Sequence, residues 1–139
     1  MSDKMSRKER EEFLKETRVG IIGIQAEGRG PVMLPIWYEY LPGGEIKFLS
    51  NKWAQKINLI EKAGRFTICV QDEKPPYKYV SVEGEVVAIE PADKERDLAP
   101  LARRYLGEEE GNQYVQETGG DEEMLIRMRP RRWSSAAYS

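Results

Sequence analysis

Apolar side chains recur at every second position through residues 31–40 of this sequence. One face of the segment carries Val32, Leu34, Ile36, Tyr38 and Tyr40. Spacing with a period of two is typical of a strand that buries one face. Turn-forming residues bracket the segment at 27–30 and at 42–44. The pattern therefore predicts a meander in which strands are joined by short turns.

Other segments of the chain also have the composition of strands. They are residues 19–25, 45–50, 65–71, 77–90 and 122–129. Pro35 cannot donate a hydrogen bond to a ladder, so the strand at 31–40 is expected at an edge or interrupted near Pro35. Gly20 and Gly23 indicate a bulge, a bend or a close backbone approach, and Gly84 predicts a bend in the long strand at 77–90.

The apolar period changes from two to that of a helix after residue 50. The residues at helical spacing are Trp53, Lys56, Ile57 and Ile60. Ser50 or Asn51 is expected to cap this helix, and Gly64 to end it. Further helices are expected over 2–16, 91–107 and 109–118, the second of them kinked or split at Pro100. The 139 residues thus predict one mainly β (α+β) domain, a small antiparallel barrel with six strands.

Composition excludes several kinds of chemistry. The chain has no histidine, which rules out Ser-His and Cys-His catalysis and histidine metal ligands. The single cysteine, Cys69, rules out an internal disulfide or a multi-cysteine zinc site, and is expected to be a small buried residue. No apolar run approaches the roughly 18 residues of a membrane span, and residues 1–18 lack the apolar core of a secretory signal. A cytoplasmic protein without a metal is expected.

The net charge of −2 hides an uneven distribution. Residues 47–65 carry five basic side chains and one acid, and residues 124–139 carry four arginines and no acid. Acids outnumber bases by eleven to four in residues 90–123. The two basic segments could converge on one anionic group, or they could simply be solvated surfaces.

The junction between strand and helix at residues 50–56 is the best local candidate for a binding site. The N-terminus of a helix presents free N–H groups and a partial positive charge. Ser50 adds a hydroxyl, Asn51 an amide, and Lys52 and Lys56 two charges four residues apart on the expected helix. A phosphate ester fits this set of groups, and two solvated lysines are the alternative.

Aromatic residues form a second set of candidates. Pro35 leaves neighbouring backbone groups unpaired, which could meet the polar edge of a planar heterocycle while Trp37 lies near its face. Tyr77 and Tyr79 are two apart on an expected strand, so they should point to the same side. A packed edge strand and a covering role over the barrel are the alternatives. Trp133 is expected in a C-terminal tail, as an anchor or a ligand contact.

With these segments placed, the chain resembles the pyridoxamine 5'-phosphate oxidase-like split-barrel flavoproteins over residues 13–133. The motifs that carry the resemblance are Gly28-Arg29-Gly30-Pro31, Leu34-Pro35-Ile36-Trp37, Phe48-Leu49-Ser50-Asn51, Gln55-Lys56-Ile57-Asn58-Leu59 and Tyr79-Val80-Ser81-Val82-Glu83-Gly84. Their order and spacing resemble most the branch that binds either FMN or the deazaflavin coenzyme F420.

The resemblance implies a six-stranded antiparallel split β-barrel with a few flanking helices. It also implies a homodimer with two cofactor sites at the interface. A Ser or Thr and an Arg-Lys pair hold the phosphate in that family, where Ser50 and Lys56 match and Gln55 replaces the arginine. Lys52 is our own candidate for the missing charge. The candidate cofactor-binding residues are Met33, Leu34, Pro35, Ile36, Trp37, Leu49, Ser50, Asn51, Lys52, Gln55, Lys56 and, closing the site from the second subunit, Tyr77, Tyr79 and Trp133.

The function implied is a flavin- or deazaflavin-dependent oxidoreductase. It would pass a hydride or two electrons between the cofactor and a small organic acceptor, and no residue is assigned a catalytic role. Pyridoxamine phosphate itself is not the expected substrate, because the chain lacks the C-terminal Arg and His segment that the true oxidases use. A non-enzymatic flavin or tetrapyrrole carrier or redox sensor is the alternative. A barrel that binds single-stranded nucleic acid is disfavoured by the pI of about 5.4.

Overall fold

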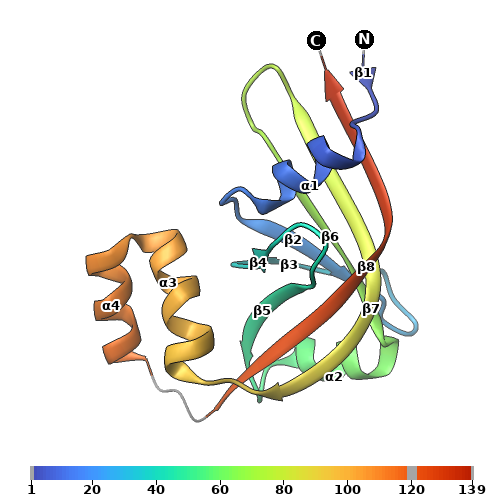
Figure 1. The fold of residues 1–139 in the computed structure, drawn as a ribbon. Coiled ribbons are helices and arrows are strands. Elements are labelled where there is room, and N and C mark those ends of the chain that lie inside the picture. The colour runs from blue at the N-terminus through green and yellow to red at the C-terminus, as the bar shows by residue number, and fades with distance from the viewer. Residues whose placement is uncertain (1, 119–121, 139) are drawn as a thin grey trace.

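A computed structural model describes residues 2–118 and 122–138, and it is mainly β (Figure 1). The strands are β1 (Ser2–Asp3), β2 (Gly20–Ile24), β3 (Val32–Ile36), β4 (Glu39–Tyr40), β5 (Ile46–Asn51), β6 (Arg65–Gln71), β7 (Lys78–Pro91) and β8 (Glu123–Tyr138). The helices are α1 (Arg7–Lys15), α2 (Gln55–Ala63), the short π-helix η1 (Lys94–Leu98), α3 (Ala99–Leu106) and α4 (Glu108–Glu117). In the described part of the chain, no helix is both long and apolar enough to cross a membrane.

All strands join one curved antiparallel sheet, in the order β3-β2-β6-β7-β8-β5-β4, with β1 paired to the end of β8. The two edges, β3 and β4, are neighbours in sequence and are separated by Trp37 and Tyr38. The hydrogen-bonded pairings of the described residues do not close the sheet between them. The predicted count of six strands is not confirmed. Eight strands are described, because the segment 31–40 is broken into β3 and β4 and because β1 is added.

The concave side of the sheet holds the main core. Alternate residues of each strand point into it, as the burial pattern of β5 and β6 shows. Phe48 and Phe66 meet there edge to face, with ring centroids 5.5 Å apart. Ile36, Tyr38 and Tyr40 are also buried, which confirms the face predicted for the segment 31–40. The helices α1 and α2 cover parts of this core, while α3 and α4 form a separate pair beside the sheet (Figure 1).

The break between β3 and β4 is filled by Tyr105 of α3. The amide of Tyr38 donates to the Tyr105 hydroxyl over 3.0 Å, and that hydroxyl donates to the carbonyl of Arg18 over 2.6 Å. Trp37 stacks parallel on the Tyr105 ring, with centroids 5.0 Å apart. Pro35 lies in the edge strand β3 opposite Ile21, so the predicted edge position is confirmed. The interruption follows Ile36, where a tyrosine hydroxyl replaces the missing sheet partner.

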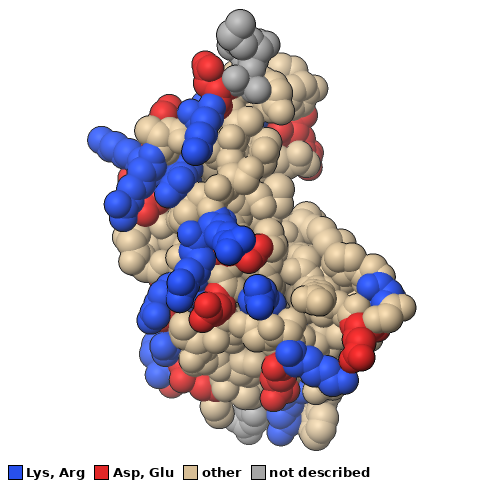
Figure 2. Space-filling view, turned by 90° about the vertical axis from the view of Figure 1, so that its right-hand side faces the viewer, with Lys and Arg blue, Asp and Glu red and all other residues tan. Residues whose placement is uncertain are grey.

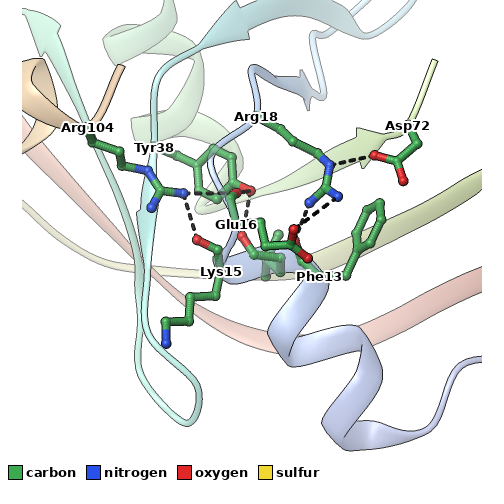
Figure 3. Close-up of polar contacts among 8 residues, drawn as sticks. Phe13, Lys15, Glu16, Arg18, Tyr38, Asp72 and Arg104 are labelled. Carbon is green, nitrogen blue, oxygen red and sulfur yellow. Dashed lines mark hydrogen bonds and ion pairs between the residues drawn. The ribbon is translucent and has the colours of Figure 1, made fainter. Parts of the chain in front are cut away.

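Polar side chains also bind the C-terminal end of α1 (Figure 3). Its last carbonyls have no partner within the helix and need donors from elsewhere. Arg104 of α3 donates to the carbonyls of Lys15 and Glu16 over 2.9 and 3.0 Å. Arg18 donates to the carbonyl of Phe13 and forms an ion pair with Asp72 at 3.0 Å. These contacts fix α1 and α3 relative to the broken strand.

Several element boundaries differ from those predicted. The helix expected over 2–16 begins at Arg7, after a capping box on Ser6, and its first residues form β1 instead. Pro91 ends β7 and does not open a helix. The predicted split near Pro100 is confirmed, because η1 ends at Leu98 and Pro100 lies in the first turn of α3.

The largest difference is at the C-terminus. The last strand was predicted to end at residue 129 with Trp133 in a tail, but β8 runs to Tyr138 and Trp133 pairs with Val82. The predicted bend at Gly84 is confirmed by a shift of register after Glu83. A Cβ atom on Gly84 would collide with the carbonyl of Arg129, so this crossing of β7 and β8 requires glycine. The long pairing of β7 with β8 explains why the arginine-rich segment is a strand.

Candidate functional site

The junction between β5 and α2 differs in detail from the predicted phosphate site. The helix α2 begins at Gln55, and its N-cap residue, Ala54, provides no side-chain cap. The predicted capping by Ser50 or Asn51 is therefore wrong. Asn51 instead accepts the amide of Trp53 over 2.9 Å, and its carbonyl accepts the amide of Ala54 over 3.0 Å. This turn places Lys52 before the helix, so Lys52 and Lys56 do not share a helix face as predicted.

The N-terminus of α2 is nevertheless open to an anion. Its first turn contains no acidic side chain. The amides of Ala54 and Ile57 donate to the backbone carbonyls of Asn51 and Ala54. The amides of Gln55 and Lys56 are the ones at this helix start that could donate to an anion, and the helix start carries a partial positive charge. Ser50, at the end of β5, is buried with 4% of its surface exposed, and its hydroxyl donates only a long 3.2 Å bond to the carbonyl of Asn51. The arrangement combines a hydroxyl, free amides and the side chains of Gln55 and Lys56.

Glu123 is a residue of this junction that the sequence did not indicate. It pairs with Asn51 across β5 and β8, and one of its carboxylate oxygens is buried without a hydrogen-bond partner among the described residues. Burial raises the pKa of Glu123, and the positive charge of Lys56 lowers it in part. Lys56 therefore lies within electrostatic reach of a half-buried carboxyl group. Only the strand register brings these two residues together.

The second predicted lysine, Lys52, lies at the surface. Its ammonium group is 5.0 Å from the ring centre of Trp53, a side chain that is 73% exposed. A contact of this kind is a weak cation–π interaction at an exposed site. Lys52 therefore adds positive charge near the start of α2 without being fixed to the junction.

The structure does not gather the predicted cofactor residues into one pocket. Four of them line four different cavities. Leu49 lines a cavity of about 290 Å³ beside η1 and α3, and Met33 lines a cavity of about 490 Å³ on the outer sheet face. Gln55 lines a cavity of about 430 Å³ between α2 and the end of β2. Trp133 lines a cavity of about 490 Å³ beside α1. A site that uses them together cannot be assembled from these cavities within one chain.

The outer face of β2 and β3 is apolar for an exposed surface, whereas β6 and β7 add the polar side chains of Arg65, Thr67, Ser81 and Glu83 to the same cavity. Ile21 and Met33 are 39% and 59% exposed there, and Pro35 and Cys69 lie opposite Ile21 on the neighbouring strands. Cys69 is only partly buried on this face, which corrects the expectation of a buried cysteine, and burial raises the pKa of its thiol. Antiparallel sheets with one wet face normally alternate apolar with polar residues. The part of this face on β2 and β3 has the composition of a covered surface.

The predicted aromatic contacts are distributed over both sides of the sheet. One face of Trp37 is covered by Tyr105, and Tyr114 lies 5.7 Å from it at a tilt. Tyr77 precedes β7, so the predicted pair of tyrosines on one strand is not formed. Tyr79 points to the opposite side from Val82, whereas Trp133 shares the side of Val82 and faces α1. Tyr79 and Trp133 therefore cannot belong to one stacking surface within a chain.

Known structures with the same arrangement of strands and helices exist. A conserved hypothetical protein, Rv2991 from Mycobacterium tuberculosis, superposes with a TM-score of 0.78 at 22% identity over 96% of this chain and 85% of that chain. A protein named F420 reductase superposes at 0.73 and 22% identity, covering 89% and 94%. A FAD-binding protein from Mesorhizobium loti gives 0.73 at 19% identity, covering 100% and 99%.

A candidate pyridoxamine 5'-phosphate oxidase from Listeria innocua superposes with a TM-score of 0.62 at 14% identity, covering 83% of this chain and 85% of that chain. The chain has the pyridoxamine 5'-phosphate oxidase-like split-barrel fold. The predicted resemblance is confirmed at the level of the fold, which is what identities this low establish. No protein-family model and no curated protein sequence matches the chain.

Two structural features of this split barrel were not predicted from the sequence. One is the position of Glu123 opposite Asn51, within electrostatic reach of Lys56, which depends on the register of β5 against β8. The other is the docking of α3 on the break at Trp37 and Tyr38. Tyr105 lies within the helix predicted over 91–107. Its spacing gave no signal for a hydroxyl that completes the edge of a sheet.

Proposed function

We propose that this split barrel is a homodimeric flavin- or deazaflavin-dependent oxidoreductase that binds FMN or coenzyme F420. It transfers a hydride or two electrons between that cofactor and a small organic acceptor other than pyridoxamine phosphate. The cofactor supplies the redox chemistry, and the chain binds it, orients it and excludes water. The names of two proteins with this fold, an F420 reductase and a FAD-binding protein, support a cofactor of this class.

The observation that carries the proposal is the uncapped N-terminus of α2 beside the buried hydroxyl of Ser50. A phosphate there would accept hydrogen bonds from the first amides of α2 and from Ser50. Gln55 would add donors without charge, and Lys56 would add a charge-assisted contact. In the free chain, the positive charge of Lys56 acts on the carboxyl group of Glu123. A bound phosphate would be a second negative group close to Lys56.

The proposed homodimer follows from the distribution of the candidate residues. Because they line four cavities in one chain, a shared site needs residues from a second copy. The apolar outer face with Ile21 and Met33 is the surface that we assign to this contact. The remaining predicted residues, Tyr77, Tyr79 and Trp133, would be contributed from the second subunit, as the family resemblance implies.

A carrier or sensor that binds the same cofactor without turnover is the second candidate. It is favoured by the stacking of Trp37 on Tyr105, which covers one ring face that was expected to lie near the cofactor. In this case the barrel would hold the ring without a free space for an acceptor beside Trp37.

The visible absorption spectrum of the purified protein, recorded before and after addition of FMN or F420, tests both candidates. A bound cofactor with a perturbed spectrum is expected for either. Steady turnover of a nitroaromatic or quinone acceptor, with reduced F420 supplied directly or reduced FMN regenerated by a chemical hydride donor, identifies the enzyme. Binding without turnover identifies the carrier, and no binding of either cofactor at micromolar concentration would refute the proposal.

A further inference from the structure

A groove lined by four arginines lies on the opposite side of the sheet from the apolar outer face. It is a cavity of about 490 Å³ between α1, the turn before β5 and the middle of β8. Arg7 and Arg10 come from α1, three residues apart and therefore on one helix face. Arg129 and Arg131 come from β8, on either side of Pro130 at the register shift opposite Glu83 and Gly84. Two pairs of guanidinium groups thus line the same space from two different elements.

The acidic side chains of this groove do not neutralise it. Glu45 lies 3.0 Å from Arg127, which is outside the groove lining, and Glu11 is 3.9 Å from Arg7 and 3.4 Å from the hydroxyl of Tyr40. Glu85, which is outside the groove lining, forms an ion pair with Arg131 at 3.5 Å. Arg7 and Arg131 thus each have a carboxylate neighbour, whereas no ion pair among the described residues joins Arg10 or Arg129 to a carboxylate. Figure 2 looks onto the side of the molecule where β7 and β8 lie, and Lys and Arg side chains gather along one edge of that view.

Arg10 is held in a fixed position with an unused donor. Its guanidinium group lies 4.6 Å above the ring centre of Trp133, which restricts its orientation. Its Nε atom is buried and has no hydrogen-bond partner among the described residues. The amide of Gly43, at the rim, makes only a long 3.4 Å contact with the Tyr40 hydroxyl.

We propose that this arginine groove binds a small polyvalent anion, one that carries at least two phosphate or carboxylate groups. Guanidinium groups bind both kinds of oxyanion with paired hydrogen bonds, which lysines do not. Two charged groups on the ligand would match the two arginine pairs, one from α1 and one from β8. The groove is lined by none of the residues at the junction of β5 and α2, and Trp133 is the residue of its lining that the proposed cofactor site also uses.

A titration of the full-length, ¹⁵N-labelled protein with sodium triphosphate, sodium citrate and sodium sulfate at equal ionic strength tests this. The chain has three tryptophans, so the indole signals of Trp37 and Trp53 are internal controls for that of Trp133. Saturable movement of the Trp133 signal is expected with triphosphate or citrate. The more tightly bound of the two shows whether phosphate or carboxylate is the preferred group.

The variant R7Q/R129Q removes one arginine from each pair, and both residues are exposed, so the fold should be retained. It should weaken binding of the preferred anion on the order of tenfold or more. The matched control, K62Q/K74Q, removes the same charge from exposed positions outside the groove and should leave the affinity within about twofold. Equal weakening in both variants, or sulfate binding as tight as that of triphosphate and citrate, would overturn the proposal. An unmoved Trp133 signal with all three anions would overturn it as well.

Discussion

Two regions of this split barrel differ in whether their polar groups have hydrogen-bond partners. At the break between β3 and β4, the amide of Tyr38 and the carbonyl of Arg18 are both satisfied by the hydroxyl of Tyr105, and Trp37 is covered by a parallel ring. At the junction of β5 and α2, the helix has no side-chain cap and Glu123 keeps a buried oxygen without a partner among the described residues.

The difference indicates which region is built for stability and which for binding. Buried polar groups are nearly always paired in folded proteins, and exceptions need an explanation such as a ligand. The first region is complete within one chain. We propose that the second region is completed by the cofactor and the apolar face around Ile21 by a second subunit. Substitutions in the first should therefore change stability, and substitutions in the second should change binding or assembly.

The largest effect is expected on the apolar outer face. Ile21→Glu would bury an unpaired charge in the proposed dimer and should weaken the dimer by roughly 3–5 kcal/mol, more than about a hundredfold. The folded monomer should persist, because the Ile21 side chain is 39% exposed in the single chain. Sedimentation velocity measures the dissociation constant, and circular dichroism checks the fold.

Val87→Glu is the matched control for this substitution. Val87 is also an apolar strand residue and is 37% exposed, but it lies at the irregularity of β7 outside the proposed contact. Its dimer should be unchanged. If both variants dissociate alike, or if the wild-type chain sediments as a monomer, the outer face is not the dimer interface.

Lys56→Ala tests whether the junction of β5 and α2 binds the cofactor phosphate. It removes a charge-assisted phosphate contact, which is worth about 1.5–3 kcal/mol, so the affinity for FMN or F420 should fall at least about tenfold. Lys62→Ala, in the last turn of the same helix, is the control and should bind normally. Fluorescence titration of the cofactor measures both. An unchanged affinity in Lys56→Ala would remove this lysine from the phosphate site.

The sequence predicted the local patterns of this fold better than its long-range contacts. The buried face of residues 31–40, the edge position of Pro35 and the end of α2 at Gly64 follow from neighbouring residues, and all are confirmed. The start of α2 was misplaced because Ser50 and Asn51 are good capping residues whose role depends on the turn after β5. Competing local preferences of this kind are decided by tertiary packing.

The strand in 130–138 and the position of Glu123 within electrostatic reach of Lys56 could not be predicted from the sequence for a different reason. Both depend on the register of β8 against β5 and β7, which joins residues far apart along the chain. Side-chain patterning specifies register only where one face is clearly apolar. Arg129, Arg131 and Arg132 give no such pattern, and the bulge after Glu83 changes the phase of the pairing.

A smaller effect is expected in the region that is complete within one chain. Tyr105→Phe keeps the stacking on Trp37 but removes the hydroxyl that serves Tyr38 and Arg18. An unpaired buried donor costs about 1–3 kcal/mol, so the free energy of unfolding should fall by this amount. Tyr114→Phe is the control, because Tyr114 is more exposed and should lose less than about 0.5 kcal/mol. Urea denaturation measures both. A weakened cofactor affinity without a loss of stability would contradict the division of roles.

The smallest effect concerns Glu123 and pH. Burial raises the pKa of this carboxyl group in the folded chain, so the folded state binds its proton more tightly than the unfolded state does. The stabilising contribution of protonated Glu123 is therefore fully present below the ordinary glutamate pKa of about 4.3 and is lost as the pH rises through the higher folded pKa. Glu123→Gln abolishes this titration, so the stability of the wild type relative to the variant should fall as the pH rises from about 4 through the raised folded pKa of Glu123. The exposed neighbour Glu122→Gln should show no such trend. The stability of both proteins at each pH is measured by urea denaturation. Parallel pH profiles for wild type and Glu123→Gln would mean that this carboxyl group is as well solvated as one on the surface. The junction of β5 and α2 would then not contain an unpaired buried charge.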